Sequence, residues 1–412
     1  MKSLFFKISC IFLLTLLPFN LISQVKIDVT INDSNDSVLY LIKYKSEKTQ
    51  VVIDSSSISS SKKTFSSQEK YDEGIYVLAD SKQQPLFELL IGKDQKFSIT
   101  VENLMDLNTY KIKGCKETSD YFKVYSKTIH ENLYIRALES ELKYNPDNAK
   151  KIDSIRKELC NYQESMLRKN KTSFLNTYIK FIEEKPVTQY FEDLPLNDIR
   201  ILNSRLLKNK LDEYFNIYMS EQNHEVICQN IDNLISKTSD CKEVRDYILW
   251  YLYSKYFNND WIYIHLSDKY FSKLTVNNLT ENIRTEIIKR ADVLRKITIG
   301  SLAPAFKYTD ENGNLINLSE TNGKHIVLFF YKPDCQKCIR DKRILELVKK
   351  RQKDLTILHI NISEDNYSNV SQNIINQYDI TTTPTIYVLD KEKKIIAKHI
   401  KAEEIEFHII KK

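Results

Sequence analysis

The chain has 412 residues, of which 61 are Lys or Arg and 55 are Asp or Glu, but only 6 are Gly and 8 are Pro. So few helix- and strand-breaking residues exclude collagen-like, glycine-rich and proline-linker proteins, and 42% hydrophobic residues exclude a disordered chain. The net charge of +6 is a small excess and gives no argument for a nucleic-acid partner. At this length we expect two or three domains.

Residues 1–23 have the pattern of a secretory signal peptide. Lys2 and Lys7 precede an apolar run over residues 8–17, and the small Ser23 marks the expected cleavage site. Pro18 ends this apolar run, so the run is too short to span a bilayer. We therefore predict an exported protein of the periplasm or cell envelope of a Gram-negative bacterium. It would have no transmembrane anchor after signal cleavage; a retained anchor is the alternative.

Residues 24–112 alternate between apolar and polar side chains or form short β-branched runs. Val51-Val52-Ile53 and Phe97-Ser98-Ile99-Thr100-Val101 are examples, and polar clusters typical of turns separate such runs. This pattern predicts an all-β, sandwich-like domain with antiparallel strands. The segment contains no His, and its carboxylates lie mostly in turns, so we assign it no catalysis.

From residue 117 to residue 297 the apolar period becomes that of an α-helix, which predicts an all-helical middle domain. Phe122, Leu133 and Leu138 share one face of the first helix, and Asn145-Pro146-Asp147 ends it. The expected N-caps of later helices are Asp147, Ser173 and Thr280. An aromatic-rich stretch over residues 247–261 is interpreted as helical core, with a binding groove as the alternative.

Strands and helices alternate over residues 298–412, which predicts an α/β domain with helices on both faces of its sheet. The expected strands are 326–331, 355–362, 385–389 and 395–400, and the expected helices are 335–352, 370–378 and 403–410.

Cys335-Gln336-Lys337-Cys338 follows the first of these strands and begins a helix. The positive end of the helix dipole and the adjacent Lys337 favour a thiolate at Cys335. Cys335 would attack a substrate disulfide, and Cys338 would resolve the mixed disulfide and release the reduced substrate.

The second element of this site is Thr383-Pro384, at the start of a later strand. A proline in this position favours a cis peptide bond. We expect that bond to turn the Thr383 backbone towards the Cys335 sulfur, where its N–H and C=O would pair with an extended substrate strand. Thr383 and Pro384 are therefore the predicted substrate-binding residues.

These motifs resemble the TlpA/ResA-like branch of the thioredoxin superfamily in order and spacing. The resemblance covers residues 298–412 and includes Gly300-Ser301-Leu302-Ala303-Pro304-Ala305-Phe306 and Asp390. The whole layout is similar to exported Bacteroidetes thioredoxin-like proteins with a β-rich leader domain and a helical middle domain. The resemblance implies a thioredoxin-like fold, with Cys335 and Cys338 as the redox pair and Pro384 before the substrate-binding strand.

The chain departs from the superfamily pattern at three places. Asp334 stands where Trp often precedes the first cysteine, and its carboxylate opposes thiolate formation, whereas Lys337 offsets it. Phe329 stands at the approximate position of the buried acidic residue beneath the cysteines. The terminal hairpin has Lys391-Glu392-Lys393-Lys394 and lacks the usual glycine. The first two departures bear on thiol pKa, so Asp334 and Lys337 are the predicted tuning residues.

Other kinds of site fit these cysteines less well. Zinc would need four ligands, and one Cys-x-x-Cys pair supplies two. A peroxiredoxin needs Pro and Thr where Leu328 and Lys332 stand. A static disulfide between Cys335 and Cys338 is the remaining alternative. The other mature cysteines pair either as Cys228 with Cys241 and Cys115 with Cys160, or remain buried free thiols, which we favour.

The sequence thus predicts a thiol–disulfide oxidoreductase with no metal and no organic cofactor. Its partners would be protein or peptide disulfide substrates and an upstream dithiol protein that donates electrons. The alternative function is an envelope binding or adaptor protein whose thioredoxin-like domain is redox-weak, because Asp334 and Phe329 both weaken the usual activation.

Overall fold

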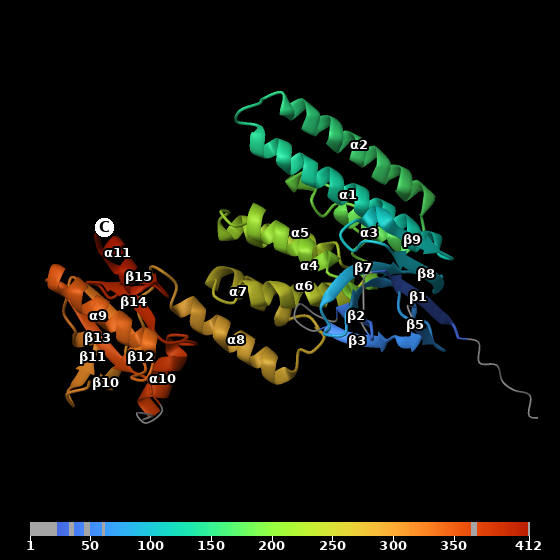
Figure 1. Ribbon diagram of the computed structural model, residues 1–412. Helices are drawn as coiled ribbons and strands as arrows, with labels where there is room; N and C mark the ends of the chain where they lie inside the picture. Colours follow the sequence, from blue (N-terminus) through green and yellow to red (C-terminus); the bar gives the residue numbers. More distant parts are fainter. Residues whose placement is uncertain (1–22, 33–36, 45–49, 60–61, 364–368, 411–412) are drawn as a thin grey trace, which may run out of the picture. The chain divides into compact units, whose positions relative to one another are not determined.

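The computed structural model describes residues 23–32, 37–44, 50–59, 62–363 and 369–410. The chain forms two compact units that divide between Glu221 and Gln222, inside the predicted helical segment, so that helices belong to both units (Figure 1). The predicted signal peptide lies outside the described residues except for Ser23. The predicted domain limits of 24–112, 117–297 and 298–412 stay predictions.

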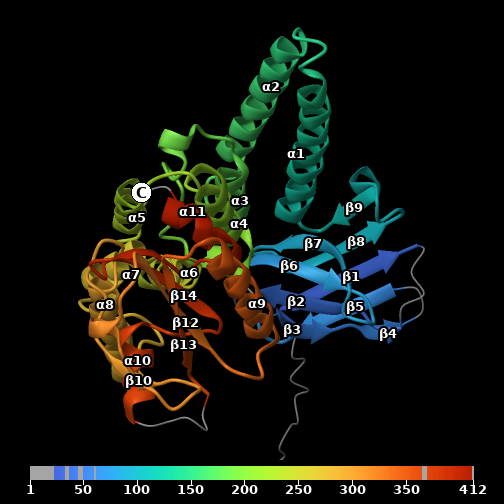
Figure 2. The same ribbon diagram turned by 90° about the vertical axis from the view of Figure 1, so that its left-hand side faces the viewer.

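The first unit begins with two β-sheets (Figure 2). Their strands are β1 (Val25–Ile31), β2 (Tyr40–Tyr44), β3 (Gln50–Ser55), β4 (Ser57–Ser59), β5 (Lys62–Ser67), β6 (Gly74–Ala79), β7 (Pro85–Ile91), β8 (Lys96–Val101) and β9 (Tyr110–Lys113). The strand orders are β4-β5-β1-β8-β9 and β3-β2-β6-β7. Because β1 runs parallel to β8, the sandwich is mixed rather than purely antiparallel. Alternation predicts which face a residue occupies, but not the direction of the neighbouring strand.

Helices of the first unit pack on these sheets and share their core. They are α1 (Lys116–Glu141), α2 (Asn148–Lys169), α3 (Phe174–Ile182) and α4 (Leu206–Glu213), and a π-helical turn, Tyr214–Tyr218, continues α4. Phe122 of α1 and Phe174 of α3 are buried in one cluster with strand residues such as Val25. Leu138 is buried as predicted, but Leu133 is 60% exposed, because this part of α1 has little besides α2 to pack against.

The second unit opens with α5 (His224–Ser236), α6 (Lys242–Lys255), α7 (Asp260–Leu266) and α8 (Glu281–Lys296). Thr280 caps α8 by accepting a hydrogen bond from the Ile283 N–H at 3.3 Å, as predicted. Asp147 and Ser173 stand at the predicted N-cap positions of α2 and α3 without a capping hydrogen bond from their side chains. Of the seven aromatic side chains in the aromatic-rich stretch, only Tyr251 is fully buried, five are partly buried and Trp261 is 53% exposed, so the interpretation as core holds only in part.

A four-stranded sheet organises the rest of the second unit. This part of the unit contains, in chain order, β10 (Lys307–Thr309), β11 (Leu315–Asn317), β12 (His325–Tyr331), α9 (Gln336–Arg351), β13 (Leu355–Asn361), α10 (Asn369–Gln377), β14 (Thr385–Asp390), β15 (Ile395–Lys398) and α11 (Ile405–Ile410). The order is β13-β12-β14-β15, with β13 parallel and β14 antiparallel to β12; β10 and β11 form a separate hairpin.

Helices cover both faces of this sheet, as predicted. Leu345 of α9 and Ile405 of α11 pack with Val327 and Phe329 on one face. On the other face the ring of Tyr378, which follows α10, contacts the rings of Phe330 and Tyr387 at 5.4 and 5.2 Å. In the β14–β15 turn Lys393 takes the left-handed conformation, with φ of 64°, where a glycine was expected.

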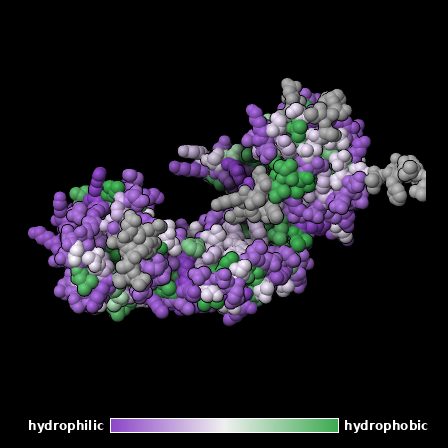
Figure 3. All heavy atoms as spheres, turned by 90° about the horizontal axis from the view of Figure 1, so that it is seen from below, coloured by the Kyte–Doolittle hydropathy of each residue, from purple (hydrophilic) through white to green (hydrophobic). Residues whose placement is uncertain are grey.

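None of the helices among the described residues is long and apolar enough to cross a membrane. Figure 3 shows one face of the molecule, on which hydrophilic residues predominate and hydrophobic ones form small groups. The 28% of residues that are charged account for this surface.

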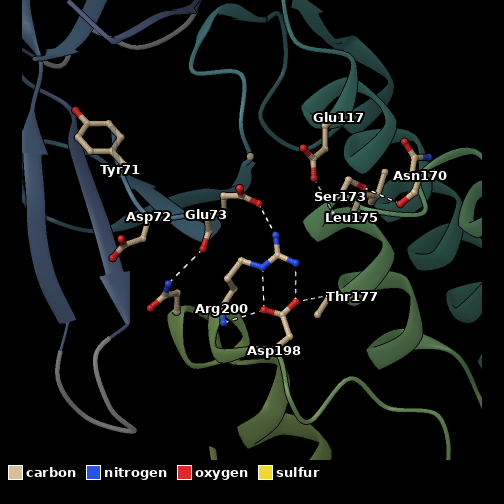
Figure 4. Close-up of polar contacts among 12 residues, drawn as sticks. Tyr71, Asp72, Glu73, Glu117, Asn170, Ser173, Leu175, Thr177, Asp198 and Arg200 are labelled. Atoms are coloured by element: carbon tan, nitrogen blue, oxygen red, sulfur yellow. Dashed lines mark hydrogen bonds and ion pairs between the residues drawn. The ribbon is translucent and has the colours of Figure 1, made fainter. Parts of the chain in front are cut away.

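Partly buried ion pairs join the layers within each unit. In the first unit the Arg200 guanidinium donates to both Asp198 oxygens at 2.8 and 2.7 Å and also binds Glu73, so it links a helical segment to the start of β6 (Figure 4). In the second unit Arg290 of α8 binds Asp379, which lies just after α10. Lys398 of β15 pairs with Asp260 of α7. These two pairs join helices of residues 222–297 to the segment after α10 and to β15 of the four-stranded sheet.

Candidate active site

The four-stranded sheet delivers Cys335 to the beginning of α9. β12 is buried on both faces and ends at Tyr331. A tight turn follows, in which the Cys335 N–H donates to the Lys332 carbonyl at 3.2 Å. Cys335 is then the N-cap of α9, and its sulfur accepts a hydrogen bond from the Cys338 N–H at 3.3 Å. The sulfur thus occupies the position of an N-cap oxygen and satisfies an N–H that would otherwise have no helical partner.

The two thiols differ in exposure and in acidity. Cys335 is half-buried, whereas Cys338 is 1% exposed. Partial burial raises the pKa of Cys335, but hydrogen bonds from the Cys338 side chain, the Cys338 N–H and the Thr383 side chain outweigh it and leave the pKa below its ordinary value. Burial, together with the neighbouring Cys335, raises the pKa of Cys338 to about 11. This difference suits one attacking thiolate and one thiol that reacts second.

Thr383 and Pro384 lie beside this pair because of strand pairing. β14 runs antiparallel to β12, with Thr385 opposite Phe330, so the residues before β14 meet the turn that follows β12. The Thr383–Pro384 bond is cis, as predicted. The Thr383 carbonyl oxygen lies 3.7 Å from the Cys335 sulfur and accepts from the thiol. Cys335, Cys338, Thr383 and Pro384 therefore form one group.

Asp334 and Lys337 lie in the same turn, but both side chains are exposed. Among the main contributions to the Cys335 pKa, that of Lys337 comes from its backbone N–H. Tuning by the Lys337 ammonium group and the Asp334 carboxylate stays a prediction.

Phe329, at the position expected for a buried acid, is fully buried in β12 and belongs to the same apolar cluster as Cys338. Its ring stacks on that of Tyr331 at 5.5 Å. On the strand β13 it is paired with His359, whose ring it meets edge-on at 5.7 Å. An aromatic side chain therefore stands where a buried acid was expected.

A cavity of about 390 Å³ lies next to Cys338 and was not predicted. Glu311, Tyr331 and Lys342 line it together with Cys338. The Glu311 carboxylate accepts from the Tyr331 hydroxyl and from the Lys342 ammonium group at 2.9 Å, and these bonds lower its pKa. Glu311 sits in the turn between β10 and β11, a polar stretch that in sequence resembles any surface turn.

The remaining cysteines are not part of this group. All six described cysteines are free thiols. Cys115 and Cys241 are buried as favoured by the sequence, but Cys160 is exposed and Cys228 half-buried. Among the residues that the structure describes, no cluster of three or more His, Cys, Asp or Glu side chains is placed to hold a metal ion.

Comparison with known proteins finds matches to part of the chain. Residues 299–399 match the model of the AhpC/TSA family. Thiol-disulfide oxidoreductase ResA of Geobacillus kaustophilus is 27% identical over 136 residues, which are 27% of this chain and 77% of that protein. ResA of Bacillus anthracis is 29% identical over 104 residues, 25% of this chain and 58% of that protein.

Among solved structures, a thioredoxin-like protein from Bacteroides caccae is 22% identical and has a TM-score of 0.46. The match covers 54% of this chain and 90% of that one.

Proposed function

We propose that this chain, a TlpA/ResA-like protein of the thioredoxin superfamily, is an exported thiol–disulfide oxidoreductase that reduces or exchanges protein disulfides through Cys335 and Cys338. One observation carries the proposal. The Cys335 sulfur is held at the start of a helix by the Cys338 N–H, its pKa is lowered, and it lies 3.7 Å from the Thr383 carbonyl oxygen. A thiol of lowered pKa that is only half-buried suits attack on a disulfide of a substrate.

The proposed reaction has two steps. The Cys335 thiolate attacks one sulfur of the substrate disulfide, so that a Cys335–substrate bond forms and the other substrate sulfur leaves as a thiolate. The Cys338 thiolate then attacks the Cys335 sulfur, which closes the Cys335–Cys338 disulfide and releases the second substrate thiolate. Two electrons pass to the substrate, whose two sulfurs take up the two protons given up by the dithiol. An upstream dithiol protein would return the pair to the reduced state.

Peroxidase chemistry is less well supported, although the matched family bears the AhpC/TSA name. The positions where a peroxiredoxin needs Pro and Thr carry Leu328, buried in β12, and Lys332. Export is proposed from the charged and apolar pattern of residues 1–23, and is tested by the N-terminal sequence of the mature protein in cell fractions.

Reduction of insulin and of a small model disulfide by the full-length chain tests this function. We expect Cys335→Ser to abolish turnover and Cys338→Ser to accumulate a mixed disulfide with the substrate, detectable by mass. Turnover of Cys335→Ser at the wild-type rate would overturn the proposal.

An envelope adaptor with a redox-weak domain is the second candidate. Phe329 favours it, because a buried phenyl ring cannot take a proton from Cys338. Titration of the Cys335 thiolate by ultraviolet absorbance separates the two functions. A pKa above about 8.5, the value of a free thiol, would favour the adaptor.

A further inference from the structure

A groove of about 890 Å³ lies in the second unit, between α8 and the segment that joins α10 to the cis proline. Its volume is within the range of roughly 300–1,000 Å³ that small-ligand sites occupy. Its lining is continuous in sequence with the candidate active site, because Ile380 and Thr381 line it and Thr383 follows two residues later. The catalytic chemistry does not use this groove.

Side chains of two kinds line the groove. Aliphatic and aromatic groups form much of it, among them Ile283 of α8, Ile375 of α10, and Tyr253 and Phe257 from the aromatic-rich stretch. Ile283 is 40% exposed, so part of its side chain is accessible to a ligand. Two members of the stretch interpreted as core from the sequence therefore also face a hollow. Such a surface suits apolar side chains of a bound chain rather than a charged ligand.

Most of the charges that line the groove are engaged by other protein groups. Arg290 binds both Asp379 oxygens at 2.8 Å and also donates to the Phe257 carbonyl at 2.9 Å, while its guanidinium lies 3.7 Å from the centre of the Phe257 ring. Glu286 pairs with Lys289 at 3.4 Å. Asp292 and Lys296 also line the groove and are exposed, so the groove combines an apolar lining with exposed charged side chains.

The position of the groove limits what can occupy it. The lining reaches Thr381, two residues before Thr383, whose carbonyl oxygen lies 3.7 Å from the Cys335 sulfur. An extended chain advances about 3.3 Å per residue. A substrate strand running along residues 381–383 would therefore bring the residues a few positions from its cystine to the end of the groove.

We propose that this groove binds an extended apolar segment of the polypeptide whose disulfide Cys335 attacks. The inference rests on the proposed function and extends it, because the helices before the thioredoxin-like domain would then select substrates by the residues that flank the cystine. Ile283 is a specificity-determining residue in this arrangement, and the Arg290–Asp379 pair holds the two walls of the groove together.

The test compares three substrates with the full-length chain. Two are synthetic peptides with the same cystine, one flanked by Ile, Leu and Phe and one by Ser and Asn. The third is oxidised glutathione, whose cysteines are not flanked by apolar residues. We expect kcat/KM for the apolar peptide to exceed that for the polar peptide by about tenfold, the scale of one well-buried contact residue. Ile283→Glu should remove this preference and leave glutathione turnover within about twofold of the wild type.

Leu347→Glu is the matched control, since Leu347 is 54% exposed on α9 and lies outside the groove. The preference for the apolar peptide should survive it. Equal kcat/KM for the two peptides in the wild type, or equal effects of Ile283→Glu and Leu347→Glu, would overturn the inference while leaving the proposed function in place.

A binding measurement separates the two proposals further. A fluorescent apolar peptide with both cysteines replaced by Ser should bind the Cys335→Ser variant, and Ile283→Glu should weaken that binding about tenfold. If the wild type reduces none of the three substrates but this peptide still binds, the proposed function fails and the groove assignment stands. A concentration-dependent dimer that Ile283→Glu dissociates would instead show that a second copy of the chain fills the groove, and would overturn the assignment.

Discussion

The ion pair between Arg290 and Asp379 gives the sharpest prediction about stability. The side chains are 14% and 8% exposed, and two hydrogen bonds of 2.8 Å join them. Arg290→Ala leaves the Asp379 carboxylate buried and unpaired and removes the cation packed over the Phe257 and Tyr263 rings. Breaking a buried pair from one side costs about 3–5 kcal/mol, so we expect the second unit to lose that much free energy of unfolding.

Urea unfolding followed by tryptophan fluorescence measures this loss selectively. The chain has two tryptophans, Trp250 and Trp261, and both belong to the second unit. With a urea dependence of about 2 kcal/mol per molar for a unit of this size, the midpoint should fall by about 2 M.

Two further variants decide whether the cause is the unpaired charge. Arg290→Met combined with Asp379→Asn should recover most of the loss, because no buried charge remains. Lys289→Ala removes only an exposed pair with Glu286 and should change stability by less than about 1 kcal/mol. The reasoning is refuted if Arg290→Ala lies within about 1 kcal/mol of the wild type, or if the double variant is no more stable than Arg290→Ala.

Three other predictions follow from the pKa shifts and from exposure. In a Cys160→Ser background, iodoacetamide should alkylate Cys335 faster than the buried Cys338 as followed by peptide mass; the opposite order would contradict the assignment. Cys338→Ala should raise the pKa of Cys335 in an ultraviolet titration, since it removes a side-chain hydrogen bond that favours the thiolate; an unchanged pKa would exclude that bond as a cause. Burial holds the pKa values of His359 and His399 below 6.5 in the folded state. As the pH falls, these two side chains are therefore protonated in the unfolded chain before they are protonated in the folded one. Their contribution to the free energy of unfolding is complete above about pH 6.5 and is lost as the pH falls through the pKa values of the folded state. We therefore expect a lower urea midpoint at about pH 5.5 than at about pH 7.5, and a higher midpoint at about pH 5.5 would contradict this reasoning.

The candidate site was predictable from sequence because its features are local. A run of buried apolar residues predicts β12, a cysteine at the helix start predicts the N-cap, and a proline before an apolar run predicts the start of β14. The approach of Thr383 to Cys335 follows once β12 and β14 are paired in one sheet.

Features set by pairing over long distances were not predictable. Arg290 and Asp379 are one arginine and one aspartate among many, and nothing in a single sequence marks them as partners. The same holds for the parallel pairing of β1 with β8, and for Glu311, whose turn is polar like any surface turn. Leu133 has the helical spacing of a core residue, but spacing does not tell whether a neighbouring element covers that turn.

The absence of an acid at Phe329 need not block the proposed second step. Burial is the largest cause of the raised pKa of Cys338, and the neighbouring Cys335 raises it further through its hydrogen bond and its charge. When the Cys335 sulfur becomes part of a mixed disulfide it carries no charge, so its electrostatic contribution disappears. The backbone of Lys332 and the side chain of Thr383, which lower the pKa of Cys338, remain in place. Formation of the mixed disulfide would thus remove the contribution of Cys335 to the raised pKa of Cys338, which favours formation of the resolving thiolate once a substrate has been captured.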